Sequence, residues 1–140
     1  MTDRITTFNL HWYDCGLTCA ENVVHEEITV YRNKKVLKFV ECNGYNERVT
    51  SEEIKLDADL VEQFFNYLEI NTTRWKTDYR VFVCDGSSWK VRMWHSSHKV
   101  TIAKGTVEYP PKGKQIEKYI RSFIENGRSL IDPRLFGCGR

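Results

Sequence analysis

The 140-residue chain lacks any long hydrophobic run. No apolar stretch approaches the roughly 20 residues that a membrane-spanning helix needs, and the N-terminal sequence MTDRITT lacks the apolar segment of a signal peptide. Hydrophobic residues make up 41% and charged residues 29% of the chain, which is typical of a globular protein and excludes a disordered one. We therefore expect a cytoplasmic protein without membrane association.

The common catalytic motifs are also missing. The chain contains no GxxxxGK(S/T) phosphate-binding loop and no GxGxxG dinucleotide motif, and it lacks the GxSxG and HExxH patterns of hydrolases. The acidic pairs Glu26-Glu27 and Glu52-Glu53 fall in strand-like sequence, where neighbouring side chains point to opposite faces. They are therefore not expected to form a carboxylate dyad. These absences favour a protein that is not an enzyme, with no catalytic residues assigned.

Cysteine occurs in an odd number, 5, at irregular spacing. This pattern favours reduced thiols over a disulfide framework. Cys15 and Cys19 are close in sequence, with His11 before them and His25 after them. Thiolates and imidazoles are zinc ligands, so these four residues are a weak candidate for a zinc site. The alternative is a glycine-containing turn with two structural thiols, because the paired CxxC spacing of strong zinc motifs is missing. No other cofactor is expected.

Strand-like alternation dominates two parts of the sequence. In the first part we expect strands at residues 5–13, 25–32, 36–42 and 48–56, with turns at 33–35 and 43–44. In the second part we expect strands at residues 79–84, 89–95 and 99–107, with a hairpin loop at 85–88. Alternation in segment 25–32 predicts His25, Glu27, Thr29 and Tyr31 on one face, and Glu26, Ile28, Val30 and Arg32 on the other.

Helical periodicity predicts two amphipathic helices. The first begins after Asp57 or Asp59, either of which is a suitable N-cap, and runs to about Ile70. The second runs from about Gly113 to Glu125. Their apolar stripes are Leu60, Val61, Phe64, Phe65 and Leu68 in the first, and Ile116, Tyr119, Ile120, Phe123 and Ile124 in the second.

The order of these elements predicts an α+β fold. Hairpins indicate a mainly antiparallel sheet of about six to seven strands, and single apolar stripes place both helices on one sheet face in a two-layer arrangement. We expect a single domain over residues 1–127 and an irregular tail over residues 128–140. The other sheet face is then solvated, covered by the tail, or used for binding.

Charge is distributed unevenly along the chain. Residues 1–73 carry 7 basic and 13 acidic side chains, whereas residues 74–128 carry 12 basic and 5 acidic ones. An asymmetry of this kind is a reason to look for an anionic partner.

The basic half contains a strand with two distinct faces. Trp89, Val91 and Met93 are predicted to face the core, and Lys90, Arg92 and Trp94 the opposite side. Arg80 is expected across the hairpin from this strand, and Lys99 follows after a short loop. The candidate binding residues are therefore Arg80, Lys90, Arg92, Trp94 and Lys99.

Three functions compete for these residues. The leading hypothesis is a non-enzymatic protein that docks on another protein, by analogy with bacterial immunity proteins and phage-encoded inhibitors of this size. Tyr, Trp and Arg dominate the energetics of such interfaces. The second hypothesis is a nucleic-acid or polyanion binder, in which the cations contact phosphates and the indole stacks on bases. Exposed aromatic residues are equally suited to a homodimer. The alternative is a solvated sheet face that binds no partner.

The third hypothesis is a small hydrolase centred on His95 and His98. These residues flank two serines, and a His-x-Ser unit is a component of two-histidine phosphoesterase motifs. A second such unit is missing, so a polar loop is the favoured alternative.

A further pattern runs through the second half. Asp85-Gly86-Ser87-Ser88-Trp89, then Gly105, then Tyr109-Pro110 and a helix, resembles the C-terminal half of small uncharacterised bacterial or phage proteins. The resemblance covers about a third of the chain. Its motifs are a turn, a core tryptophan and a strand-ending proline, so it implies a fold and assigns no activity and no site.

Overall fold

The computed structural model describes residues 3–14, 23–45, 47–80, 87–106 and 110–126. The first part of the chain forms strands β1 (Ile5–Asp14), β2 (Val23–Tyr31), β3 (Val36–Asn43) and β4 (Arg48–Lys55), followed by helix α1 (Ala58–Asn71). The second part forms β5 (Asp78–Tyr79), β6 (Ser87–His95), β7 (Val100–Gly105) and helix α2 (Gly113–Asn126). The expected tail, residues 128–140, lies outside the described residues.

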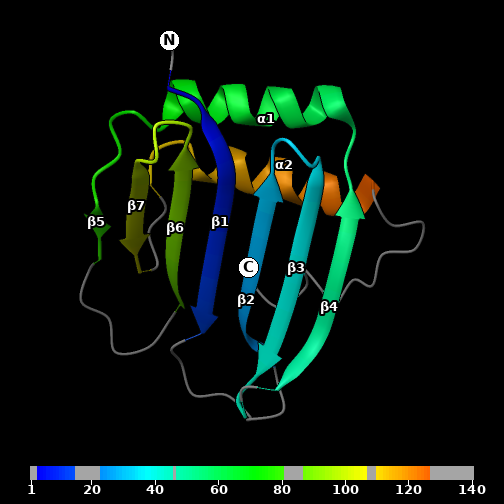
Figure 1. Cartoon of the computed structure of the whole chain (residues 1–140). Coiled ribbons are helices and arrows are strands. Elements are labelled where there is room, and N and C mark those ends of the chain that lie inside the picture. The colour runs from blue at the N-terminus through cyan, green and yellow to red at the C-terminus, as the bar shows by residue number, and fades with distance from the viewer. Residues whose placement is uncertain (1–2, 15–22, 46, 81–86, 107–109, 127–140) are drawn as a thin grey trace.

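The seven strands form one sheet in the order β4-β3-β2-β1-β6-β7-β5 (Figure 1). Every neighbouring pair is antiparallel except β5 and β7. The α+β class with a mainly antiparallel sheet is therefore confirmed. β1 lies in the middle of the sheet, between β2 and β6, so it joins the acidic first half of the chain to the basic second half.

The edge of the sheet differs from the sequence prediction. An antiparallel hairpin between residues 79–84 and 89–95 is expected from the sequence, but β5 pairs with β7 in parallel, with Tyr79 opposite Gly105. Residues 81–86 lie outside the described part of the chain. The Tyr79 ring lies 6.0 Å from the Trp89 ring. The edge strand therefore packs on a side chain of β6, although it does not pair with β6. Local turn residues do not encode such a contact.

The hydrophobic core joins the sheet to the two helices. Phe8 of β1 is fully buried, and its ring meets that of Phe64 in α1 edge-on, with 5.4 Å between centroids. Phe64 packs in the same way on Phe123 of α2, also at 5.4 Å. Each edge-to-face pair adds about 0.5–1.5 kcal/mol beyond the burial of its area. Figure 1 shows α2 behind the strands and α1 across their upper ends.

Both helices follow their sequence signals. The Asp57 carboxylate accepts hydrogen bonds from the backbone N–H groups of Asp59 at 2.9 Å and Leu60 at 3.1 Å, so Asp57 is the N-cap. Every member of the two predicted apolar stripes is buried, except Leu60 and Tyr119, which are partly buried. Neither of these two helices is long and apolar enough to cross a membrane.

Arg32 ties β1 and β2 to α1 from inside the protein. Its side chain is only 4% exposed. The guanidinium donates a pair of hydrogen bonds to Glu62, at 3.0 and 2.8 Å, and a further one to Glu69 at 2.8 Å. It also donates to the backbone carbonyl of Ile5 at 2.9 Å. The hydrogen bonds to Glu62, with the smaller contribution of Glu69, raise the pKa of Arg32 despite its burial.

Trp89 and Gly105 fit together on neighbouring strands. Gly105 stands opposite Trp89 in the β6–β7 register, and a Cβ atom at position 105 would lie 2.5 Å from Cζ2 of the indole. The indole Nε1 donates a hydrogen bond to the Thr106 carbonyl at 3.0 Å. The indole therefore occupies the space that any other residue at 105 would fill. This contact is a physical reason for the tryptophan and the glycine in the pattern that runs through the second half.

Candidate binding face of the sheet

The two faces of β6 separate as the alternation predicts. Trp89, Val91 and Met93 are 7%, 4% and 0% exposed and belong to the core. Lys90 and Trp94 alternate with them and are partly exposed. Arg92 is partly exposed on the same side. The sequence prediction of a core face and an outer face is confirmed for this strand.

The strand register extends the outer face across the middle of the sheet. Three cross-strand rows run over β6, β1 and β2: Trp94, Thr7 and Tyr31; Arg92, Asn9 and Thr29; and Lys90, His11 and Glu27. Tyr13 stands opposite His25 in the next row. We call the surface formed by Lys38, Tyr31, His25, His11, Tyr13, Lys90, Arg92 and Trp94 the basic-aromatic face.

Cations and aromatic rings are interleaved at the β2–β3 side of this face. The ammonium of Lys38 lies 5.5 Å from the centre of the Tyr31 ring, and that of Lys34 lies 5.2 Å from it. These are cation–π distances. The Tyr31 ring therefore lies within cation–π distance of two positive charges.

A chain of three rings lies on β1 and β2. The Tyr13 hydroxyl lies 2.7 Å from Nδ1 of His11, and Nε2 of His11 lies 3.2 Å from Nδ1 of His25. The ring centroids of His11 and Tyr13 are 4.1 Å apart. Both nitrogens of His11 are therefore engaged, which fixes the orientation of its ring on the face.

The surroundings of His11 favour its neutral form. Burial lowers its pKa, Glu27 acts in the opposite direction, and the charges of His25, Arg92 and Lys90 lower it further. The net result is a pKa below the ordinary value of 6.5. The imidazole is therefore uncharged at neutral pH, where it presents an uncharged aromatic ring beside the cations of β6.

Asn9 is a buried polar side chain in the middle row of the face, with an incomplete set of hydrogen bonds. Its side chain is 6% exposed, and its Nδ2 donates to the Thr29 hydroxyl at 3.0 Å. Its Oδ1 is buried without a hydrogen-bond partner in the described structure. If the amide were flipped, Oδ1 would bond to the Thr29 hydroxyl and Nδ2 would take the buried position without a partner. A buried unpaired acceptor costs about 1–3 kcal/mol, so the sequence here is not optimised for stability alone.

Positive charge exceeds negative charge on this side of the sheet. The register places Lys38, Lys55, Lys90, Arg92 and Lys104 there, against Glu27, Glu53 and Asp78. Within the described ranges, neither Lys90 nor Arg92 forms an ion pair. At the β7 edge, Val100 is 42% exposed and Ile102 39% exposed. The surface thus combines unneutralised cations, aromatic rings and an aliphatic border.

Two of the predicted binding residues lie elsewhere. Arg80 follows β5 at the edge of the sheet, where its Nη2 lies 2.6 Å from Asp78 and its hydrogen bonds lower the pKa of that carboxyl to about 2. The placement of Arg80 across a hairpin from β6 is wrong, because β5 pairs with β7 instead. Lys99 precedes β7 and lines a cavity beside His95. Lys90, Arg92 and Trp94 remain together.

The weak zinc candidates are brought together only in part. His11 and His25 are in contact, whereas Cys15 and Cys19 lie outside the described residues. Among the residues that the structure describes, no group of three or more metal-binding side chains is assembled. Within the described residues, the candidate zinc site thus consists of the contact between the His11 and His25 imidazoles.

The two histidines of the hydrolase hypothesis differ in their positions. His95 ends β6, is 12% exposed and lines the cavity that also contains Lys99. His98 lies in the β6–β7 turn with a φ of 72° and is exposed. It is not among the residues that line the cavity. The structure thus places His95, and not His98, at this cavity.

Comparison with protein-family models, with curated proteins and with solved structures finds no match to this chain. The residues that sequence reasoning missed are Asn9, Tyr13 and Lys38. It also missed that Lys90 stands opposite His11 on the neighbouring strand. Alternation assigns each of them to a strand face. The pairing of β1 with β6 brings those faces together, and no local signal in the sequence encodes it.

Proposed function

We propose that this protein is a docking protein that binds an acidic surface of another protein through the basic-aromatic face. The proposal includes a two-layer arrangement, in which both helices pack on the opposite side and leave this face open. Alternate burial along β6 supports that arrangement, because the residues between Lys90, Arg92 and Trp94 are the ones buried against the core.

One observation carries the proposal. The register of β6, β1 and β2 aligns Trp94 with Tyr31 and places Arg92 and Lys90 beside them. Tyr, Trp and Arg are the residues that contribute most to protein interfaces. The two β6 cations have no carboxylate partner within the described residues, so a partner's acidic groups would meet unneutralised charge.

The composition of the surface favours a protein over a nucleic acid. The Glu27 carboxylate lies in the same row as Lys90. A protein partner can place a basic side chain opposite it within a mainly acidic surface, whereas a phosphate backbone is uniformly negative. The exposed side chains of Val100 and Ile102 add contact area to a protein interface. They add nothing to phosphate attraction.

The test compares two charge reversals of equal size. Arg92→Glu lies in the face, and Arg74→Glu is its control, because Arg74 is exposed beyond the end of α1. Tagged wild type and both variants are mixed with nuclease-treated extract of the native host, and captured proteins are quantified by mass spectrometry. We expect a partner that is retained by wild type and R74E and lost by R92E.

Other results would assign the face differently. Equal capture by R92E and wild type would remove it as a docking surface. Nuclease-sensitive material released by salt would favour a nucleic-acid binder, because the affinity of such a complex falls linearly with salt on logarithmic axes. Self-association that is lost only in R92E would identify the partner as a second copy of the chain.

A further inference from the structure

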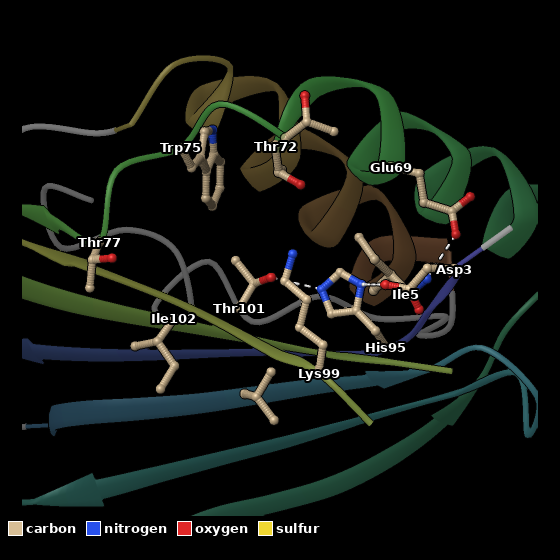
Figure 2. A pocket seen from close by; sticks show the side chains of 12 residues that line it. Asp3, Ile5, Glu69, Thr72, Trp75, Thr77, His95, Lys99, Thr101 and Ile102 are labelled. Atoms are coloured by element: carbon tan, nitrogen blue, oxygen red, sulfur yellow. Dashed lines mark hydrogen bonds and ion pairs between the residues drawn. The ribbon is translucent and has the colours of Figure 1, made fainter. Parts of the chain in front are cut away.

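A cavity of about 490 Å³ lies between the segment around the end of α1 and the β6–β7 hairpin. Figure 2 shows its side chains: Trp75 and Thr72 extend from the segment around the end of α1, and His95, Lys99 and Thr101 from the β6–β7 hairpin. Small-molecule sites commonly occupy about 300–1,000 Å³. The cavity therefore has the size of a site for a small organic molecule.

Three side chains in this cavity form a hydrogen-bonded series. Nδ1 of His95 lies 3.1 Å from Oδ2 of Asp3, and Nε2 lies 2.7 Å from the hydroxyl oxygen of Thr101 (Figure 2). The His95 side chain is 12% exposed. The imidazole is thus held from both sides, with a carboxylate on one nitrogen and a hydroxyl on the other.

The charge of Asp3 sets the direction of these hydrogen bonds. Partial desolvation raises the pKa of Asp3, whose side chain is 38% exposed, but hydrogen bonds with Ser97 and the charge interaction with His95 outweigh it and lower the pKa below its ordinary value. An ionised carboxylate only accepts hydrogen bonds, so Nδ1 of His95 carries the proton. In the neutral tautomer with its proton on Nδ1, His95 accepts a hydrogen bond from the Thr101 hydroxyl at Nε2. This is the arrangement in which a histidine activates a hydroxyl nucleophile.

The cavity also contains a positive charge beside the hydroxyl. Lys99 lines the cavity together with Thr101, and Figure 2 shows its side chain among those that surround the cavity. Within the described residues Lys99 forms no ion pair. The nearby Glu69 carboxylate is already bound by Arg32 and by the backbone N–H of Ile5. The Lys99 ammonium is therefore available to a group that develops negative charge in the cavity.

We propose that this cavity is an acyl-transfer site for small carboxylic esters, with Thr101 as nucleophile and His95 as general base. Asp3 is a positioning residue, and Lys99 stabilises the oxyanion. The flat side of Trp75, whose Nε1 is fixed to the Pro111 carbonyl at 2.9 Å, forms an apolar wall for the substrate. The cavity shares Val100 and Ile102 with the aliphatic border of the docking surface. Its reacting residues lie outside the basic-aromatic face, and acyl transfer does not require docking.

The reaction balances with water as the second substrate. The Thr101 oxygen attacks the ester carbonyl carbon while its proton passes to Nε2 of His95. The tetrahedral oxyanion collapses, the bond to the alcohol oxygen breaks, and His95 returns the proton to the departing alcohol. Water, deprotonated by His95, then cleaves the acyl-threonine ester, which releases the carboxylic acid and restores the Thr101 hydroxyl.

The test uses p-nitrophenyl acetate, with hydrolysis followed by absorbance and the acetylated residue located by peptide mass spectrometry. We expect wild-type turnover with an acetyl group on Thr101. Thr101→Val replaces the hydroxyl by a methyl group of similar size and should abolish both signals, while Thr101→Ser should retain both. His95→Asn should lower kcat at least about 100-fold. His98→Asn is the matched control and should behave as wild type.

The role of Asp3 has its own readout. Asp3→Asn should lower kcat with little change in KM, and Asp3→Glu should restore part of the rate. Hydrolysis that is unchanged in T101V and H95N would overturn the proposal, as would acetylation of surface lysines alone or no turnover by wild type. Capture of the docking partner by T101V separates the two functions, because docking does not require the hydroxyl.

Discussion

The two faces of the sheet each carry a tryptophan and an arginine, and they use them in opposite ways. On the buried side, Trp89 packs against Gly105 and Arg32 is enclosed by two carboxylates. On the outer side, Trp94 and Arg92 are partly exposed, and Arg92 has no carboxylate partner within the described residues. The first pair stabilises the fold. We propose that Trp94 and Arg92 bind a partner protein.

The largest contrast is expected between the two arginines. Arg32→Ala leaves Glu69 and Glu62 without their cation and removes the link from β2 to α1, so we expect a loss of about 3 kcal/mol in the free energy of unfolding. Arg92→Ala should change stability by no more than about 0.5 kcal/mol. Urea denaturation of both variants measures the difference. Equal destabilisation would mean that Arg92 is as structural as Arg32.

Gly105 tests the buried tryptophan. Gly105→Ala places a methyl group within 2.5 Å of the indole, so Trp89 or the β7 backbone must move. We expect a loss of about 2 kcal/mol, read from the shift of the urea midpoint. Val100→Ala is the control, because Val100 stands opposite Trp94 on the outer face. A tolerated G105A would show that the Trp89 contact is looser than the structure indicates.

A substitution at Asn9 tests whether a polar residue of the outer face lowers the free energy of unfolding. Asn9→Leu removes the buried unpaired Oδ1 and keeps a side chain of similar shape. We expect the variant to be more stable by about 1 kcal/mol and to bind the partner with unchanged affinity, because a partner cannot reach the buried Oδ1. Thermal unfolding and affinity are measured on the same preparation. A destabilised N9L would indicate that the hydrogen bond to Thr29 matters more than the unpaired acceptor.

His11 gives the smallest effect, and it depends on pH. Its folded-state pKa lies below 6.5, so the unfolded chain takes up the proton first as the pH falls. Its contribution to stability is therefore complete above the unfolded pKa and declines as the pH drops through and below about 6.5. Urea midpoints at about pH 7.5 and pH 5.5 should differ more in wild type than in His11→Gln. An identical pH dependence would exclude this role for His11.

Local patterns predicted much of this structure. The alternation in β2 and β6 separated core from outer residues, and Asp57 marked the start of α1. Strand order was not predictable, because the pairing of β1 with β6 depends on contacts between residues far apart in sequence. The same limit explains the misplaced Arg80 and the unforeseen neighbours Asp3 and Thr101 of His95. The His95–Asp3 contact joins residues far apart in sequence, whereas His95 and Thr101 meet across the β6–β7 hairpin, whose register the sequence does not specify.

The most direct measurement is the affinity of the captured partner for Trp94→Ala, with Arg74→Ala as the control away from the face. A hot-spot tryptophan contributes about 2 kcal/mol or more, which corresponds to an affinity loss of about 30-fold. We predict that loss for W94A, with R74A unchanged and both variants folded by circular dichroism. Wild-type affinity in W94A would contradict the assignment of the basic-aromatic face as the docking surface.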